Sequence, residues 1–179
     1  MGRYRMVRMD GESFRCLWLE NIGAVSLVTG RNGKKILRLP EGAPEDSAEM
    51  FLEGWKQGRH CREWETGDEL RWQGMIREAF LEAGEEPVQV TMDAGPGVWG
   101  SCEARRQGIH LNAGLSGFPL ASGRSVLMHE ICHLRDWEHT ASFWQHLTSL
   151  MPEWPYWDGM LRGMAAVKRR NQNRSGMRG

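Results

Sequence analysis

The sequence lacks the apolar runs that would indicate a membrane protein or a secreted one. Its longest apolar-rich segment, residues 22–28, is far shorter than the roughly 20 residues that a membrane-spanning helix needs. The first fourteen residues contain no apolar stretch of the kind found in secretory signals. The four cysteines form no CxxC pair, and stand at Cys16, Cys61, Cys102 and Cys132. We therefore expect a cytoplasmic protein with reduced thiols and no membrane association.

An excess of charge of one sign is also absent, because 23 lysines and arginines balance 23 aspartates and glutamates. A net charge of zero provides no general attraction to nucleic acids or to membrane surfaces. Basic residues do gather in the segment 168–179, which holds no acidic and no aromatic residue. We interpret this segment as part of a solvated tail, which gives only a weak indication of contact with phosphate groups.

The chain does have the composition of a folded domain. It contains 179 residues, 40% of them hydrophobic, and nine tryptophans, which suits a single core. The segment HEICH (129–133) has the HExxH pattern of zincin-type helices. We predict an α+β fold in which an N-terminal antiparallel β segment is followed by helices and a small sheet packed on this HExxH helix. One domain is expected over residues 1–165, with a β-rich part at 1–40, a metal-site core at 88–162 and a basic flexible tail at 166–179.

Strand signals lie in two parts of the sequence. Asn32-Gly33 is a strong hairpin signal and predicts that residues 23–29 pair with residues 35–39. Further along, VQVTM (88–92) and GIHLN (108–112) alternate apolar and polar residues and predict two short strands.

Helix signals fill the regions between and after these strands. Patterns of the D/T-x-x-E type, beginning at Asp46 and Thr66, predict capping boxes at the starts of two helices. A central helix is predicted at 124–135. A last amphipathic helix is predicted to take Thr140 as its N-cap and to end at Pro152.

The segment HEICHLRDWEH, residues 129–139, contains three histidines and a glutamate. On a helix, His129 and His133 lie on one face, one turn apart, so both imidazoles can reach a common ion. Glu130 is displaced by about 100° around the axis and can flank the ion without binding it. A turn after the helix would bring His139 to the same face. Three imidazoles leave one position open, as in catalytic zinc sites, although imidazoles also bind other ions.

A different interpretation of these histidines has to be weighed. A bare HExxH pattern also arises by chance, and two histidines can be hydrogen-bonded within a core. The third histidine at this spacing favours metal binding. The remaining histidines, His60, His110 and His146, are interpreted as surface or packing residues, and Cys132 as a small buried hydrophobe.

Four segments in order resemble the YgjP-like metallopeptidase domain: WGSC (99–102), IHLN (109–112), HEICHLRDWEHTASFW (129–144) and MPEW (151–154). That family is related to the gluzincins and, more distantly, to SprT-like proteins. The resemblance covers residues 88–162. It implies that His129, His133 and His139 bind zinc and that Glu130 is the catalytic glutamate.

The sequence departs from related patterns at a few positions. Asp136 stands where the metzincin motif has a glycine, and no Met-turn signature follows, so the metzincin assignment fails. The YgjP-like family commonly has a basic residue at the position of Val98 and an asparagine at that of Glu138. The first departure puts in doubt a basic contact with substrate, but it does not affect the metal site.

Residues ahead of the motif are candidates for the surroundings of the metal. Gly100 is expected to permit a close approach of the backbone, and Trp99 to pack against the central helix. Ser101 is expected to line the cleft or to have a structural role. Asn112 is expected to hydrogen-bond either a ligand imidazole or a loop. No residue is predicted to bind an organic cofactor.

These features predict a zinc-dependent hydrolase, most specifically a metallopeptidase that uses a zinc-activated water and Glu130 as general base. The substrate, a peptide or a small molecule, is not indicated. One alternative is a metal-dependent nucleoside triphosphate pyrophosphatase, although no GxxxxGK[ST] phosphate-binding loop is present. Another is a non-catalytic, zinc-stabilised interaction module, against which the intact Glu130 argues.

Overall fold

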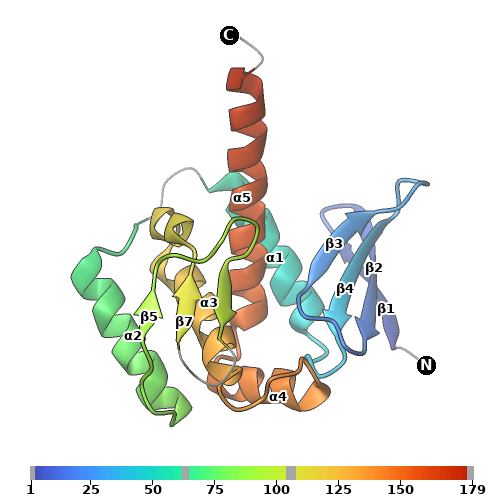
Figure 1. Cartoon of the computed structure of the whole chain (residues 1–179). Helices are drawn as coiled ribbons and strands as arrows, with labels where there is room; N and C mark the ends of the chain where they lie inside the picture. Colours follow the sequence, from blue (N-terminus) through green and yellow to red (C-terminus); the bar gives the residue numbers. More distant parts are fainter. Residues whose placement is uncertain (1–2, 62–64, 104–107, 177–179) are drawn as a thin grey trace.

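The computed structural model describes residues 3–61, 65–103 and 108–176, with the backbone alone at 170–176. The fold of these residues is α+β, as predicted, with a four-stranded N-terminal sheet, five α-helices and a second, three-stranded sheet. The long helix α5 (Trp154–Gly176) runs through the middle of the molecule, between the two sheets (Figure 1). No helix in this described part is both long and apolar enough to span a bilayer.

The N-terminal sheet has the strand order β1-β2-β4-β3. Its strands are β1 (Tyr4–Met9), β2 (Glu12–Leu19), β3 (Ser26–Thr29) and β4 (Lys35–Pro40). The predicted antiparallel pairing is confirmed for β1 with β2 and for β3 with β4, while the central pair, β2 with β4, is parallel. The β3–β4 hairpin turns at Gly33, whose φ of 74° favours glycine.

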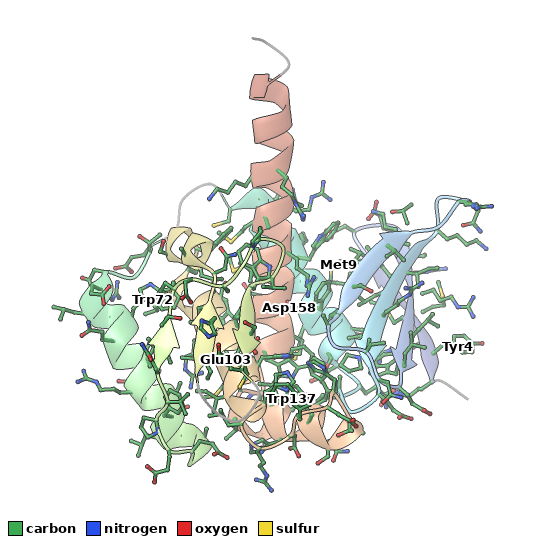
Figure 2. The ribbon with its side chains drawn as sticks, in the orientation of Figure 1. Tyr4, Met9, Trp72, Glu103, Trp137 and Asp158 are labelled. Atoms are coloured by element: carbon green, nitrogen blue, oxygen red, sulfur yellow. The ribbon has the colours of Figure 1, made fainter. Side chains whose placement is uncertain are left out.

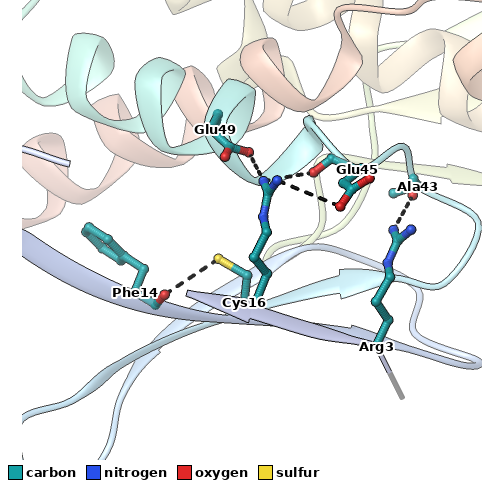
Figure 3. A network of polar contacts seen from close by, with 7 residues as sticks. Arg3, Phe14, Cys16, Ala43, Glu45 and Glu49 are labelled. Atoms are coloured by element: carbon teal, nitrogen blue, oxygen red, sulfur yellow. Dashed lines mark hydrogen bonds and ion pairs between the residues drawn. The ribbon is translucent and has the colours of Figure 1, made fainter. Parts of the chain in front are cut away.

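Polar contacts attach this sheet to helix α1 (Ser47–His60). Arg3 donates a hydrogen bond to the carbonyl of Ala43 at 3.2 Å, just ahead of the helix (Figure 3). Arg5 donates to the carbonyl of Glu45 at 3.1 Å and forms an ion pair with Glu49 in the first turn. The sheet and the helix therefore form one packed unit.

Helices α1 and α5 approach each other closely through four glycines. These are Gly54 and Gly58 on α1, and Gly159 and Gly163 on α5. A Cβ atom added to any of them would lie between 1.9 and 2.3 Å from a backbone carbonyl oxygen of the other helix. Only glycine is compatible with this separation, so the two backbones are in direct contact.

The second sheet has the order β5-β7-β6 and consists of β5 (Val90–Thr91), β6 (Gly100–Cys102) and β7 (Ile109–Leu111). It confirms the two strands predicted at 88–92 and 108–112, each in shorter form. Ile109 and Leu111 of β7 are fully buried, and the strand contacts helix α3 (Leu120–Cys132). Strand β6 lies at an edge of the sheet and also contacts α3.

Both predicted capping boxes are wrong. The Asp46 side chain makes no cap hydrogen bond, because its backbone is already helical, at φ −81° and ψ −6°. Helix α2 (Glu69–Ala83) is capped by Asp68, which accepts from the N–H of Arg71, while Thr66 lies in an isolated bridge with Pro119. The third predicted cap is confirmed, because Thr140 accepts from the N–H of Phe143 at 3.4 Å.

The bounds of the later helices also differ from the prediction. The central helix α3 covers residues 120–132 instead of 124–135. Helix α4 (Ala141–Leu150) follows as predicted, but α5 was not predicted at all. Most of the segment predicted as a basic tail, residues 166–176, is the last part of this helix.

Candidate metal centre

The three histidines of the HEICHLRDWEH segment converge, although they come from different local structures. His129 lies on α3, His133 directly follows the end of that helix, and His139 lies just before α4. The Nε2 atom of His139 is 2.9 Å from that of His129 and 3.1 Å from that of His133. Among the described residues, these three form the group whose ligand atoms lie within 4.8 Å of one another.

A backbone contact fixes the orientation of His133. Its Nδ1 lies 3.0 Å from the carbonyl oxygen of Asp136, which accepts a hydrogen bond only if Nδ1 carries the proton. The Nε2 atom of the neutral ring then presents a lone pair to the other two imidazoles. Asp136 therefore contributes to the site through its backbone, in the turn where the metzincin motif has glycine.

Burial keeps the three imidazoles neutral. It lowers the pKa of His139 to about 4, with a smaller contribution from the charge of His133. It also lowers the pKa of His129 well below its usual value, and that of His133 to a smaller extent. At neutral pH all three rings are therefore in the form that binds metal ions.

The donor set fits a tetrahedral ion. Zinc–nitrogen bonds of 2.0–2.1 Å in tetrahedral geometry separate neighbouring nitrogen atoms by about 3.3 Å. The two Nε2 separations of 2.9 and 3.1 Å are within a few tenths of an ångström of that value. The same separations allow N–H···N hydrogen bonds between neutral rings, whereas a bound ion would accept a lone pair from all three Nε2 atoms.

Two aromatic rings from α4 enclose the imidazoles. The Phe143 ring centroid lies 4.6 to 4.9 Å from the centroids of all three histidines. Trp144 stacks on His139 at 5.6 Å and meets His129 edge-on at 5.4 Å. Both rings are almost completely buried, so they fix the imidazole planes and exclude water from behind them.

Glu130 lies beside the histidines and is buried to 6% exposure. Burial raises the pKa of its carboxyl group to about 7. A Cβ atom on Gly100 would lie 2.9 Å from both Cγ and Oε1 of Glu130, so the backbone of β6 presses on this side chain. The expected close approach at Gly100 is confirmed, and it restricts where the carboxyl group can lie.

The other predicted neighbours have separate positions. The ring of Trp99 meets Phe118 edge-on at 5.5 Å, and Ser101 is exposed and lines the cleft. The side chain of Asn112 caps the short 3-10 helix η1 (Ala113–Gly117) by accepting from the N–H of Gly114, and it donates to the carbonyl of Val98 at 3.0 Å. Asn112 was expected to hydrogen-bond either a ligand imidazole or a loop, and these contacts correspond to the loop.

The histidines and Glu130 open into a cleft of about 890 Å³. Its walls include Trp137, Asp158 and Arg162, none of which was predicted as a site residue. Trp137 lies between His133 and His139 in the chain and is 57% exposed, with its ring 6.1 Å from that of His133 (Figure 2). Asp158 and Arg162 lie on α5, so their helical spacing of four residues was the signal that could have found them.

A family model described as "YgjP-like, metallopeptidase domain" matches residues 69–163, which is more than half of the chain. This chain belongs to the YgjP-like metallopeptidase family. No curated protein and no solved structure matches it. The matched part of this YgjP-like chain contains the three histidines, Glu130 and the cleft wall on α5 as far as Gly163. It does not contain the N-terminal sheet or α1.

Proposed function

We propose that this chain is a zinc-dependent metallopeptidase. In this proposal His129, His133 and His139 hold the ion and Glu130 is the general base. The observation that carries it is the position of a buried carboxyl group with a pKa of about 7 beside three neutral imidazoles. Zinc is proposed because an all-imidazole set with one open position suits this ion. When bound, zinc would polarise a carbonyl group and acidify a water molecule.

The environment of Glu130 suits a group that accepts a proton and later donates it. A base works best when its pKa lies near the working pH, and burial brings that of Glu130 to about 7. The backbone at Gly100 limits the motion of the carboxylate, so less reorganisation is needed during the reaction. Glu130 is thus placed to accept a proton at a carboxylate oxygen and to pass it to a leaving amine.

The edge strand β6 supports a peptide as the substrate. On either side of β7, the carbonyl of Trp99 accepts from the N–H of Asn112 at 2.8 Å, and the N–H of Glu103 donates to the carbonyl of Gly108 at 3.0 Å. Because these groups alternate along an antiparallel strand, the N–H and C=O of Gly100 point away from β7. Gly100 lines the cleft, so an extended peptide can pair with this edge beside Glu130.

A test begins with metal content. Elemental analysis of the purified protein should find zinc, and His139→Ala should lower that content. A proteome-derived peptide library, analysed by mass spectrometry, should show cleavage by the wild type. Glu130→Gln should retain zinc and lose turnover, because the amide cannot accept the proton. Cleavage by Glu130→Gln at the wild-type rate would contradict the role of Glu130.

The pyrophosphatase alternative has less support from the cleft. Glu130 would repel phosphate groups beside the histidines, and Arg162, Lys168 and Arg169 in the same cleft offset part of this repulsion. A panel of nucleoside triphosphates with detection of released pyrophosphate separates this activity from peptide cleavage. The non-catalytic alternative predicts that metal removal unfolds the protein and that no substrate is turned over.

A further inference from the structure

One wall of the cleft has no role in the proposed chemistry. It is formed by a face of α5 that carries Asp158, Arg162, Ala165 and Arg169, at spacings of four, three and four residues. Residues at these spacings share one side of a helix, and all four line the cleft. Lys168 lies beside them and extends to the opposite wall, with its Nζ 5.3 Å from the ring of Phe118.

Arg162 is held by one edge of its guanidinium group. Its Nε lies 3.0 Å from each carboxylate oxygen of Asp158, and the two side chains are 34% and 19% exposed. No hydrogen bond from either Nη atom to another described residue is found. A guanidinium group has five N–H donors in a planar fork, so most of them remain available to a ligand.

The cationic side chains that line the cleft follow one another along α5. Arg162 lines the same cleft as the three histidines. Lys168 and Arg169 are six and seven residues further along α5, which corresponds to about 9–10 Å. An extended peptide covers that distance in about three residues.

The balance of charge favours a singly charged group as the ligand of Arg162. Asp158 already neutralises this arginine in part, and Glu130 adds a second acidic group to the cleft. A carboxylate accepts two parallel hydrogen bonds from a guanidinium fork and brings one negative charge. A phosphate would bring more negative charge close to both carboxyl groups.

We propose that the α5 wall is a carboxylate-binding subsite, in which Arg162 binds an acidic group of the substrate and Lys168 and Arg169 attract further ones. The subsite deepens the proposed function and rests on it. It makes acidic peptides the preferred substrates. The carboxylate that Arg162 binds comes either from an Asp or Glu side chain or from the C-terminus of the peptide.

Binding to the zinc-loaded Glu130→Gln variant tests this subsite without consuming the ligand. Labelled octapeptides of one neutral sequence are compared with versions in which a single Gln is replaced by Glu at each position in turn. Each is made with a free and with an amidated C-terminus, which distinguishes the two sources of the carboxylate. The best acidic peptide should bind about tenfold more tightly than its neutral counterpart.

The second set of variants assigns that preference to α5. Asp158→Asn with Arg162→Gln removes both charges together, since Arg162→Gln alone would leave a poorly solvated carboxylate without its partner. The pair of changes should abolish the tenfold preference. Lys168→Glu with Arg169→Glu, at exposed positions, should reverse it. Arg71→Gln, which removes an arginine paired with Glu65 away from the cleft, should not change it.

The outcomes separate the subsite from the peptidase function. If acidic peptides bind in this way but the wild type cleaves none of them, the subsite stands and the peptidase proposal fails. If neutral and acidic peptides bind and are cleaved equally, the subsite is wrong and the peptidase proposal stands. Binding of nucleoside triphosphates that is tighter than that of any acidic peptide, and that depends on Arg162, would also overturn the carboxylate assignment.

A separate contact points to a role for the N-terminal sheet at the metal centre. Gly23, in the loop between β2 and β3, lies against His139: a Cβ atom there would be 3.2 Å from both Nδ1 and Cε1 of the ring. Gly42, after β4, lies so close to Ala141 that an added Cβ would be 2.3 Å from its carbonyl oxygen. We infer that the sheet, which is outside the matched family region, positions His139 for metal binding.

Metal affinity measures this positioning directly. Gly23→Val should weaken zinc binding by about 10–100-fold in a competitive chelator titration, because the larger side chain displaces the His139 ring. The thermal stability of the metal-free variant should stay close to that of wild type. Gly74→Ala, with nothing within 4 Å of the added Cβ, is the control. Unchanged zinc affinity in Gly23→Val would refute the positioning role.

Discussion

Replacing Gly159 by alanine tests the close packing of α1 against α5. The added Cβ would lie 2.1 Å from the carbonyl oxygen of Phe51, whereas ordinary contact begins at 3.4 Å. The two helix backbones therefore have to separate by 3.4 − 2.1 = 1.3 Å at this point. Neither atom belongs to a flexible side chain, so a rotamer change cannot relieve the overlap.

Two opposing effects determine the magnitude. Alanine in place of glycine within a helix stabilises by about 1 kcal/mol. Overpacking costs about 1–3 kcal/mol, and an overlap between backbone atoms belongs at the upper end of that range. Gly159→Ala should therefore lower the free energy of unfolding by about 2 kcal/mol, which corresponds to a fall in Tm of roughly 4–8 °C for a chain of this size.

Urea unfolding in the presence of a chelator measures this change, because metal binding would otherwise add to the stability of the folded state. Gly74→Ala on α2 is the matched control, since its Cβ meets nothing within 4 Å. It should stabilise the protein by about 0.5–1 kcal/mol. If Gly159→Ala proves as stable as Gly74→Ala, the direct contact between the α1 and α5 backbones is refuted.

Three further predictions concern the metal centre and its support. Gly100→Ala should retain zinc but lower kcat by about 10–100-fold in the peptide cleavage assay, because its Cβ would displace the Glu130 carboxylate; an unchanged kcat would contradict the restraint. Metal-free protein should lose stability in urea titrations as the pH falls from about 6.5 toward 4, because the unfolded chain takes up protons on the three histidines that the folded chain does not. The raised pKa of Glu130 acts in the opposite direction between about 7 and 4.5, so metal-free Glu130→Gln should lose stability more steeply over this range, and an equal slope would contradict the shift. A fragment of residues 69–179 should aggregate or fail to give a cooperative transition by circular dichroism, because α1 no longer covers the glycine face of α5; cooperative unfolding of the fragment would refute this.

Short sequence patterns correctly predicted the turns and caps that depend only on neighbouring residues. The Asn32-Gly33 hairpin and the Thr140 cap depend on a few neighbouring residues, and both are confirmed. The convergence of the histidines was predicted from spacing alone, since one helical turn and one chain reversal are sufficient to produce it. The close approach at Gly100 was also predicted correctly, because a missing side chain beside a buried motif leaves room for the backbone to contact it.

Helix α5 escaped prediction because its stability comes from elsewhere in the chain. It contains Pro155 near its start and Gly159 and Gly163 in its first half, all of which have low helix propensity. Those same glycines allow close contact with α1, a segment about 100 residues earlier in the chain. The cleft wall with Asp158 and Arg162 was missed for the same reason, since their spacing of four residues becomes a signal only once the segment is recognised as a helix.

The start of α3 illustrates a similar limit. The segment LASG at 120–123 has the composition of a loop but forms the first turn of the helix. Gly123 is required there because an added Cβ would lie 2.3 Å from the indole ring of Trp72 on α2. Packing between α2 and α3 thus explains the glycine at position 123. Composition alone could not distinguish a glycine required by helix packing from a glycine in a turn.

The aromatic enclosure of the histidines also provides an optical signal for any metal ion that binds there. The Trp144 indole stacks on His139 at 5.6 Å, and the Trp137 indole lies 6.1 Å from His133. An open-shell ion such as Co²⁺ or Cu²⁺ bound to these imidazoles would quench the emission of both indoles, whereas zinc would leave it bright. Exchange of one ion for another, and competition by a ligand in the cleft, would therefore be visible as fluorescence of the unlabelled chain.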